Sequence, residues 1–237
     1  MMQRFMWLSS SKRDVLKWDI SMYCKAYFDK VAPVFANIDE DAANAADLYL
    51  ETVGSGQYNP NIGNEADIAS DAHYYGISYG ISMELMKYNV RLMSIATLYQ
   101  FWEQQVRKFL YEELIERNHE NINFKDFCTN IGTIKAEFLM CGVKLDDLPS
   151  WEKINELREF QNLVKHGDGR ARKILEQARP DLFRKVNEET SAIDYHFTTL
   201  NEQVLDVSDD ELTVYSEALM EFWDELPERM YVQPPQS

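Results

Sequence analysis

Residues 157–169 contain the side chains of this sequence that are best suited to chemistry. When the segment is placed at 100° intervals around a helix, one arc collects four polar residues, namely Arg158, Asn162, Lys165 and His166. The opposite arc collects four apolar residues, namely Leu157, Phe160, Leu163 and Val164. No other histidine of the chain lies within a helical turn of both an arginine and a lysine. We therefore expect a helix with one face in the core and one face available for a ligand.

An imidazole between cations is typical of phosphate chemistry. Histidine exchanges protons at physiological pH, and neighbouring cations hold a phosphate and stabilise the charge that develops on it. This combination suits metal-independent RNA cleavage, in which a base removes the ribose 2′-OH proton and the freed oxygen attacks the adjacent phosphate. The alternative is structural: His166 simply ends a helix, where a cationic ring favours the helix dipole. Lys165 is then solvated and Asn162 forms local hydrogen bonds.

Other reactive constellations are missing from the sequence. The Glu116-x-x-His119 spacing is half of a di-iron carboxylate set, and no other histidine has a carboxylate three residues before it. There is no glycine-rich phosphate loop and no Gly-x-Ser-x-Gly elbow. The three cysteines, Cys24, Cys128 and Cys141, are odd in number and widely spaced, which argues against a disulfide framework. We expect neither a metal nor a cofactor.

The charge of the chain is unevenly distributed. The formal net charge of −16 argues against general coating of nucleic acid, which requires a basic surface. Residues 158–185 nevertheless contain eight lysines or arginines and four acidic residues, so this window is near +4. A local basic surface of this kind can bind a phosphate backbone or an acidic partner. The alternative is that these cations are solvated helix faces.

The elements that must position these residues are predicted to be helices. Glycine and proline are scarce, with 9 and 7 residues, and this scarcity favours long helices. The expected helices span residues 14–36, 39–53, 65–118, 124–141, 151–166, 170–178 and 208–225, with a loop at 54–64. The segment 65–118 lacks proline and is apolar on most faces between residues 88 and 102, which predicts a long central helix. Gly76 and Gly80 allow close helix packing or mark a kink.

These elements predict the fold class and the cellular setting. We expect a single all-α domain over residues 1–230, a multi-helix bundle with a small extended piece near residues 192–207 and a flexible tail at 231–237. No run of about 18 apolar residues occurs, and residues 1–11 lack a sustained apolar run. We therefore expect a soluble, cytoplasmic protein that does not enter a membrane.

Residues 157–169, together with the preceding long apolar helix, resemble the HEPN superfamily of small all-α bacterial proteins. The HEPN pattern is an arginine, then a polar residue that is often asparagine, then three variable residues and a histidine near a helix end. Asn162 and His166 match the polar residue and the histidine, and the Asn-x-x-Lys-His-Gly-Asp-Gly sequence is similar to that of an uncharacterised subgroup. Gln161 occupies the arginine position, which is a departure from the pattern.

The resemblance implies two functional hypotheses. In the first, the protein is an RNase or RNA-binding effector in bacterial defence or a toxin–antitoxin system. His166 is then the general acid or base, Lys165 and Arg158 contact phosphate, and Asn162 orients the substrate. In the second, catalysis is lost, as Gln161 and the acidic surface favour, and the chain is an interaction module or regulatory subunit of a multi-protein system. In either case the family implies a homodimer in which two motifs form one cleft, and a protein partner from the same system.

Overall fold

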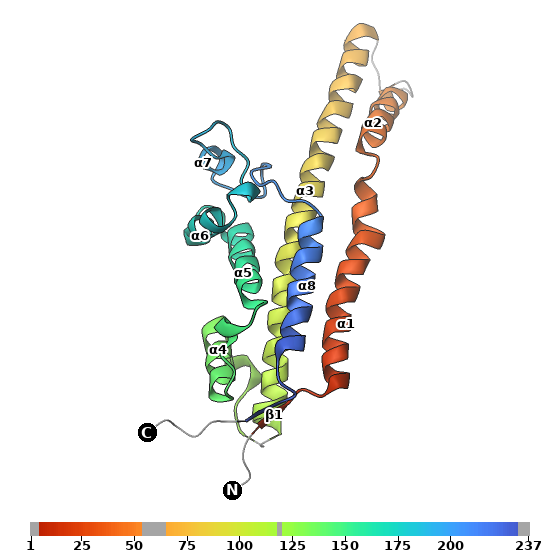
Figure 1. Cartoon of the computed structure of the whole chain (residues 1–237). Coiled ribbons are helices and arrows are strands. Elements are labelled where there is room, and N and C mark those ends of the chain that lie inside the picture. Colours follow the sequence, from red (N-terminus) through yellow and green to blue (C-terminus); the bar gives the residue numbers. More distant parts are fainter. Residues whose placement is uncertain (1–4, 54–64, 118–119, 232–237) are drawn as a thin grey trace.

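The computed structural model describes residues 5–53, 65–117 and 120–231, and these form a predominantly helical fold (Figure 1). The longer helices are α1 (Ser10–Ala26), α2 (Ile38–Thr52), α3 (Glu65–Tyr111), α4 (Ile131–Met140), α5 (Trp151–His166), α6 (Arg170–Ala178) and α8 (Asp210–Glu225). The shorter elements are helix α7 (Ala192–His196) and strands β1 (Phe5–Trp7) and β2 (Arg229–Tyr231). Within the described residues, no helix combines the length and apolar character needed to cross a membrane.

Helix α3 is the axis of the molecule, as the sequence predicts. Its 47 residues extend for about 70 Å at ~1.5 Å per residue. Its core face consists of buried residues spaced alternately four and three apart, namely Tyr88, Leu92, Ile95, Tyr99, Trp102, Val106 and Phe109. Helices α1, α5 and α8 pack around this half of α3 and bury the stripe (Figure 1). A single π-helical turn, Glu112–Glu116, continues α3 at its end.

The first half of α3 lies outside this core and pairs with α2. We call α2 together with residues 65–87 of α3 the α2–α3 arm, which projects beyond the rest of the molecule in Figure 1. Gly76 permits the close approach, because a Cβ atom there would lie 2.8 Å from the Ala42 carbonyl oxygen. Ile38 is the only buried residue of α2. The arm is therefore held mainly by contacts between its own two helices.

The two ends of the described chain meet in a small sheet. Strand β1 pairs antiparallel with β2, with Met6 opposite Met230, and both methionines are buried. Tyr231, which the sequence assigns to a tail, is the last residue of β2 and lies opposite Phe5. Residues 232–237, the remainder of the expected tail, lie outside the described residues, as does the expected loop at 54–64.

Several expected boundaries are wrong. The helix predicted at 124–141 begins only at Ile131, because Asn130 and Thr133 form a reciprocal capping box there. The extended piece predicted near 192–207 is instead the short helix α7 followed by a loop, in which Leu205 forms an isolated bridge with Phe183.

Candidate functional site

Helix α5 has the bounds that the sequence predicts. Its apolar arc is buried: Leu157, Phe160 and Leu163 are 0% exposed, and Val164 is 6% exposed. The helix ends at Gly167, whose φ of 68° and ψ of −142° lie in a region that residues with a side chain rarely adopt. This glycine lets the chain turn sharply directly after His166. Ser150, which directly precedes α5, donates its hydroxyl hydrogen to Glu225 of α8, at 2.6 Å.

Three of the four predicted site residues line one pocket of about 350 Å³. Arg158, Asn162 and His166 contribute to it from successive turns of α5. The rest of its wall comes from Glu159 and from the corner that leads into α6, namely Gly167, Gly169, Arg170 and Ala171. Lys165 is exposed and does not line this pocket, so the structure separates it from the other three. The pocket gains Arg170, a cation that the sequence argument does not place at the site.

Arg158, one of the two cations expected to contact phosphate, is already paired. The Arg158 guanidinium donates to Glu159 Oε1 at 2.5 Å from Nη2 and 3.2 Å from Nε. Glu159 is only 4% exposed, so its carboxylate is compensated mainly by this arginine. The helical wheel offers no sign of this pairing, because it places Glu159 about 100° from Arg158. Glu159, like Arg170, is a residue of the site that the sequence does not reveal.

The charge of Arg158 also acts on a second carboxylate, Glu103 of α3. Burial raises the pKa of Glu103, an effect that the Tyr99 hydrogen bond and the charges of Arg158 and Arg107 only partly offset. The Tyr99 hydroxyl donates to Glu103 Oε1 at 3.2 Å. Arg158 therefore experiences acidic groups on two helices, which lowers its capacity to bind an external anion.

Asn162 and His166 have side chains that are free to bind a ligand. Within the described part of the chain, neither side chain has a hydrogen-bond or ion-pair partner. Asn162 is partly buried, whereas His166 is exposed. The amide and the imidazole at the pocket are thus available for a phosphate or a ribose hydroxyl.

The basic window 158–185 retains four free cations. Its four acidic residues each pair with a cation of the same window: Glu159 with Arg158, Asp168 and Glu176 with Arg172, and Asp181 with Arg179. Lys185 also contacts Glu176, at 3.5 Å. Lys165, Arg170, Lys173 and Arg184 have no ion-pair partner among the residues that the structure describes. The free charge therefore lies at the end of α5, on α6 and just beyond it.

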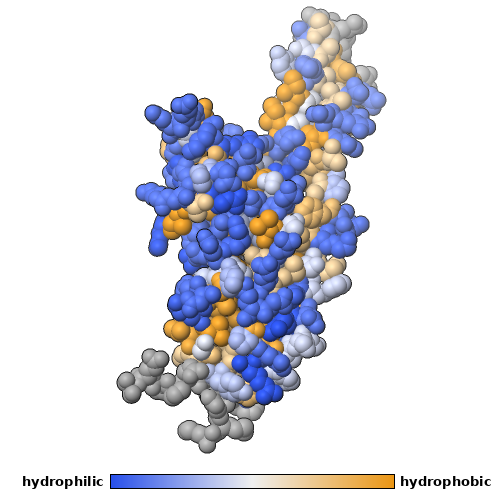
Figure 2. Space-filling view, viewed as in Figure 1, coloured by the Kyte–Doolittle hydropathy of each residue, from blue (hydrophilic) through white to orange (hydrophobic). Residues whose placement is uncertain are grey.

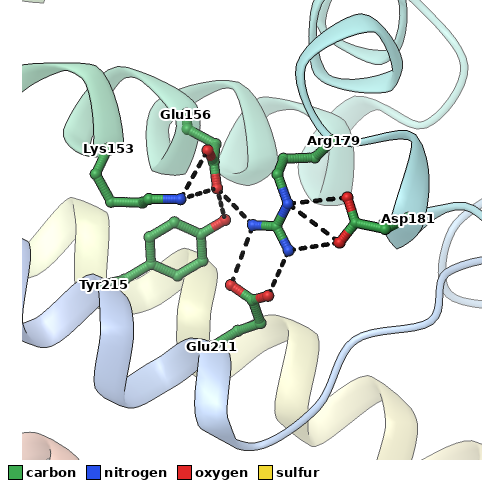
Figure 3. Close-up of polar contacts among 6 residues, drawn as sticks. All are labelled: Lys153, Glu156, Arg179, Asp181, Glu211 and Tyr215. Atoms are coloured by element: carbon green, nitrogen blue, oxygen red, sulfur yellow. Dashed lines mark hydrogen bonds and ion pairs between the residues drawn. The ribbon is translucent and has the colours of Figure 1, made fainter.

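Arg179 ties the pocket to the core rather than binding a ligand (Figure 3). Its guanidinium contacts Glu156 of α5 at 2.8 Å and Glu211 of α8 at 2.6 Å. It also contacts Asp181 at 2.7 Å, and this hydrogen bond lowers the pKa of the Asp181 carboxyl. Tyr215 of α8 donates to the same Glu156 oxygen, at 2.8 Å. The network fixes the end of α6 against α5 and α8.

The segment after α7 holds the end of α5. The Thr199 hydroxyl donates to the Val164 carbonyl oxygen at 3.2 Å. A Cβ atom added to Gly167 would lie 3.2 Å from the carbonyl oxygen of Phe197. This segment therefore constrains the turn that follows His166.

Gln161 is buried, with 7% exposure, and does not line the pocket. The position that carries the arginine in the HEPN pattern is therefore outside the pocket in this chain. Arg158, one turn earlier, is the α5 cation that shares the pocket with Asn162 and His166.

No family model, curated protein or solved structure matches this chain. Among the described residues, no three or more histidine, cysteine, aspartate and glutamate side chains gather closely enough to hold a metal ion. His119, the histidine of the Glu116-x-x-His119 spacing, lies outside the described residues. The candidate site is therefore the pocket lined by Arg158, Asn162, His166 and Arg170, which we call the α5–α6 pocket.

Proposed function

We propose that this chain is a HEPN-like protein whose α5–α6 pocket binds the phosphates of RNA, and that His166 transfers the proton in metal-independent cleavage. The observation that supports the proposal is the presence of Arg158, Asn162, His166 and Arg170 around one pocket. An imidazole, an amide and two guanidinium groups at one site match what a phosphodiester transition state requires.

In the proposed reaction, each residue of the pocket has a separate role. The imidazole of His166 accepts the proton of a ribose 2′-OH, and the 2′-oxygen attacks phosphorus. The bond from phosphorus to the 5′-oxygen breaks, and that oxygen takes up a proton. The products are a 2′,3′-cyclic phosphate and a 5′-hydroxyl. Arg170 and Arg158 stabilise the developing charge on the phosphoryl oxygens, and Asn162 orients the ribose or the phosphate by hydrogen bonding.

The reaction needs both a base and an acid, and each chain contributes one imidazole to its pocket. A homodimer that brings two pockets together supplies both, with one His166 removing the 2′ proton and the other protonating the 5′-oxygen. Dimerisation through the α5–α6 surface is therefore part of the proposal. The resemblance implies bacterial defence or a toxin–antitoxin system as the setting.

Cleavage of a labelled RNA in the presence of EDTA tests the proposal. His166→Ala should slow cleavage by about 10² to 10⁴-fold, the usual contribution of a general acid or base, and should leave RNA affinity nearly unchanged. His196→Ala is the matched control, because His196 is an exposed histidine outside the pocket. Equal cleavage by the His166→Ala variant would remove His166 from the mechanism.

A second function is favoured by the ion pair between Arg158 and Glu159. Because Glu159 already compensates this arginine, the pocket has less positive charge than the basic window indicates. We propose as the alternative that the chain is a catalytically inactive interaction module of a multi-protein system. An RNA-binding assay at low salt separates the two functions, since absence of both binding and cleavage favours the module.

A further inference from the structure

We infer that the α2–α3 arm is a docking site for a basic amphipathic helix of another protein. The inference does not depend on the α5–α6 pocket and holds for either proposed function. It follows from an uncovered apolar stripe, from a groove beside that stripe, and from the charge of the arm.

The apolar stripe continues the pattern that builds the core. The buried series of α3 that starts at Tyr88 extends toward the N-terminus at steps of three and four residues through Leu85, Ile81, Ile77 and Tyr74. Leu85 still packs against the core, but Ile81 is 66% exposed, Ile77 is 44% exposed and Tyr74 is 64% exposed. An apolar stripe with this three- and four-residue spacing is typical of a helix surface that packs against another helix. Figure 2 shows apolar surface along the projecting end of the molecule, beside strongly hydrophilic surface.

A groove of about 530 Å³ runs along this stripe, between α2 and α3. On the α3 side it extends from His73 to Glu84, which corresponds to about 17 Å or three helical turns. Ile77 and Ile81 line it, together with Gly76 and Gly80, where an added Cβ would lie 2.8 Å and 3.3 Å from atoms of Ala42 in α2. The dimensions suit a helix that places its apolar face in a groove.

The negative charge of the arm favours a positively charged partner. The arm contains nine acidic residues and a single cation, Lys87, so its net charge is −8, half that of the chain. Asp39 and Glu84 line the groove, and neither has an ion-pair partner among the described residues. A helix with lysine or arginine beside its apolar stripe compensates these carboxylates.

The same charge argues against a second copy of the arm. Two arms in contact would bring together two surfaces that each carry a net charge of −8, with little screening between charges closer than the Debye length of about 8 Å at physiological salt. Like charges brought together in this way oppose association. A basic partner gains electrostatic attraction at the surface where a second copy meets repulsion.

Binding of synthetic helices tests the inference. The probe is a fluorescent peptide of about three heptads with leucine at the a and d positions and lysine elsewhere. It should bind the full-length protein, and a peptide of identical composition with a scrambled leucine pattern should bind about 100-fold more weakly. The double variant Ile77→Ser with Ile81→Ser should also lose about 100-fold, as expected for two buried apolar side chains. The control is Val15→Ser with Val34→Ser, two exposed valines outside the groove that should leave binding unchanged.

Two results would overturn the inference. Equal binding of the ordered and scrambled peptides would show general attraction between opposite charges. Conversion of a homodimer to a monomer by the Ile77→Ser, Ile81→Ser variant would show that a second copy occupies the stripe. The substituted side chains are exposed, so circular dichroism and thermal unfolding should show an unchanged fold in all variants.

Discussion

At the scale of single residues, the pairing of Arg158 with Glu159 reduces the free positive charge at the pocket. The sequence places this arginine on a polar face, whereas the structure adds a nearly buried carboxylate at 2.5 Å. Asn162 and His166 remain free of such partners within the described residues. The pocket therefore combines a compensated cation with an available amide and imidazole.

Glu159→Gln should increase RNA affinity by releasing Arg158. We expect a gain of about ten-fold at low salt, the effect of one additional charge-assisted hydrogen bond of about 1.4 kcal/mol. Fluorescence anisotropy with an RNA oligonucleotide measures it. Glu152→Gln is the control, because this glutamate is exposed on the same helix and does not line the pocket. An equal gain in both variants would mean that only the net charge matters.

Gly167→Ala should destabilise the fold by about 1–3 kcal/mol, because the backbone there has a positive φ that strains a residue with a side chain. The added Cβ would also lie 3.2 Å from the Phe197 carbonyl oxygen. Urea unfolding gives the free energy. Gly169→Ala should cost much less, since a Cβ there has no neighbour within 4 Å and φ is −167°. Similar losses at the two glycines would contradict the role assigned to the turn.

At the scale of elements, the helices are joined by a few shared polar groups. Arg179 holds the end of α6 against α5 and α8. Asp209, just before α8, accepts hydrogen bonds from Arg91 of α3 at 2.7 Å and from Tyr27 at the end of α1 at 2.6 Å. Each of these two side chains thus connects elements that are distant in the sequence.

The contribution of Asp209 should depend on pH. Burial alone would raise the pKa of Asp209, but the hydrogen bonds from Arg91 and Tyr27 and the Arg91 charge outweigh it, so the pKa is lowered. A lowered carboxyl pKa gives stability that is present above the unfolded-state value of about 3.9 and is lost as pH falls through the folded-state value.

Asp209→Asn should therefore reduce the free energy of unfolding by about 1–3 kcal/mol at pH 7, and the difference from the unsubstituted protein should shrink below pH ~4. Urea unfolding at several pH values checks this. Asp206→Asn is the control, because Asp206 is exposed. A difference that stays constant down to pH ~2 would show that the charge of Asp209 is not the stabilising feature.

At the scale of the whole molecule, charge is separated along the structure. The arm has a net −8, whereas the window 158–185 is near +4. If two copies join through their α5–α6 surfaces, the cations of the two surfaces repel each other. A polyanion bound between the copies would compensate this repulsion. The acidic arms remain available for basic partners.

RNA should therefore stabilise the homodimer that we propose. The measurement is light scattering of the His166→Ala variant, which leaves the RNA intact. It should show a mass of two chains. At low micromolar protein concentration the dimer should dissociate, and an added RNA oligonucleotide should suppress this dissociation. Poly-glutamate is the control for polyanion charge alone. A monomer in the presence of RNA would contradict the shared cleft.

The sequence predicts the central helix, the bounds of α5 and α6, and the burial of Leu157, Phe160 and Leu163. These features follow from local periodicity and from glycines that end a helix, so nearby residues are enough to determine them. The late start of α4 departs from the expected boundary, although it also has a local cause in Asn130 and Thr133.

Contacts between distant segments decide the rest. The compensation of Arg158 depends on how far Glu159 is buried under other elements, and the pairing of Phe5 with Tyr231 joins opposite ends of the chain. Tyr74, Ile77 and Ile81 of α3 continue the apolar spacing of the core, and only the tertiary structure shows that they remain exposed. Periodicity specifies which face of a helix is apolar, but packing determines what that face contacts and which charges remain free.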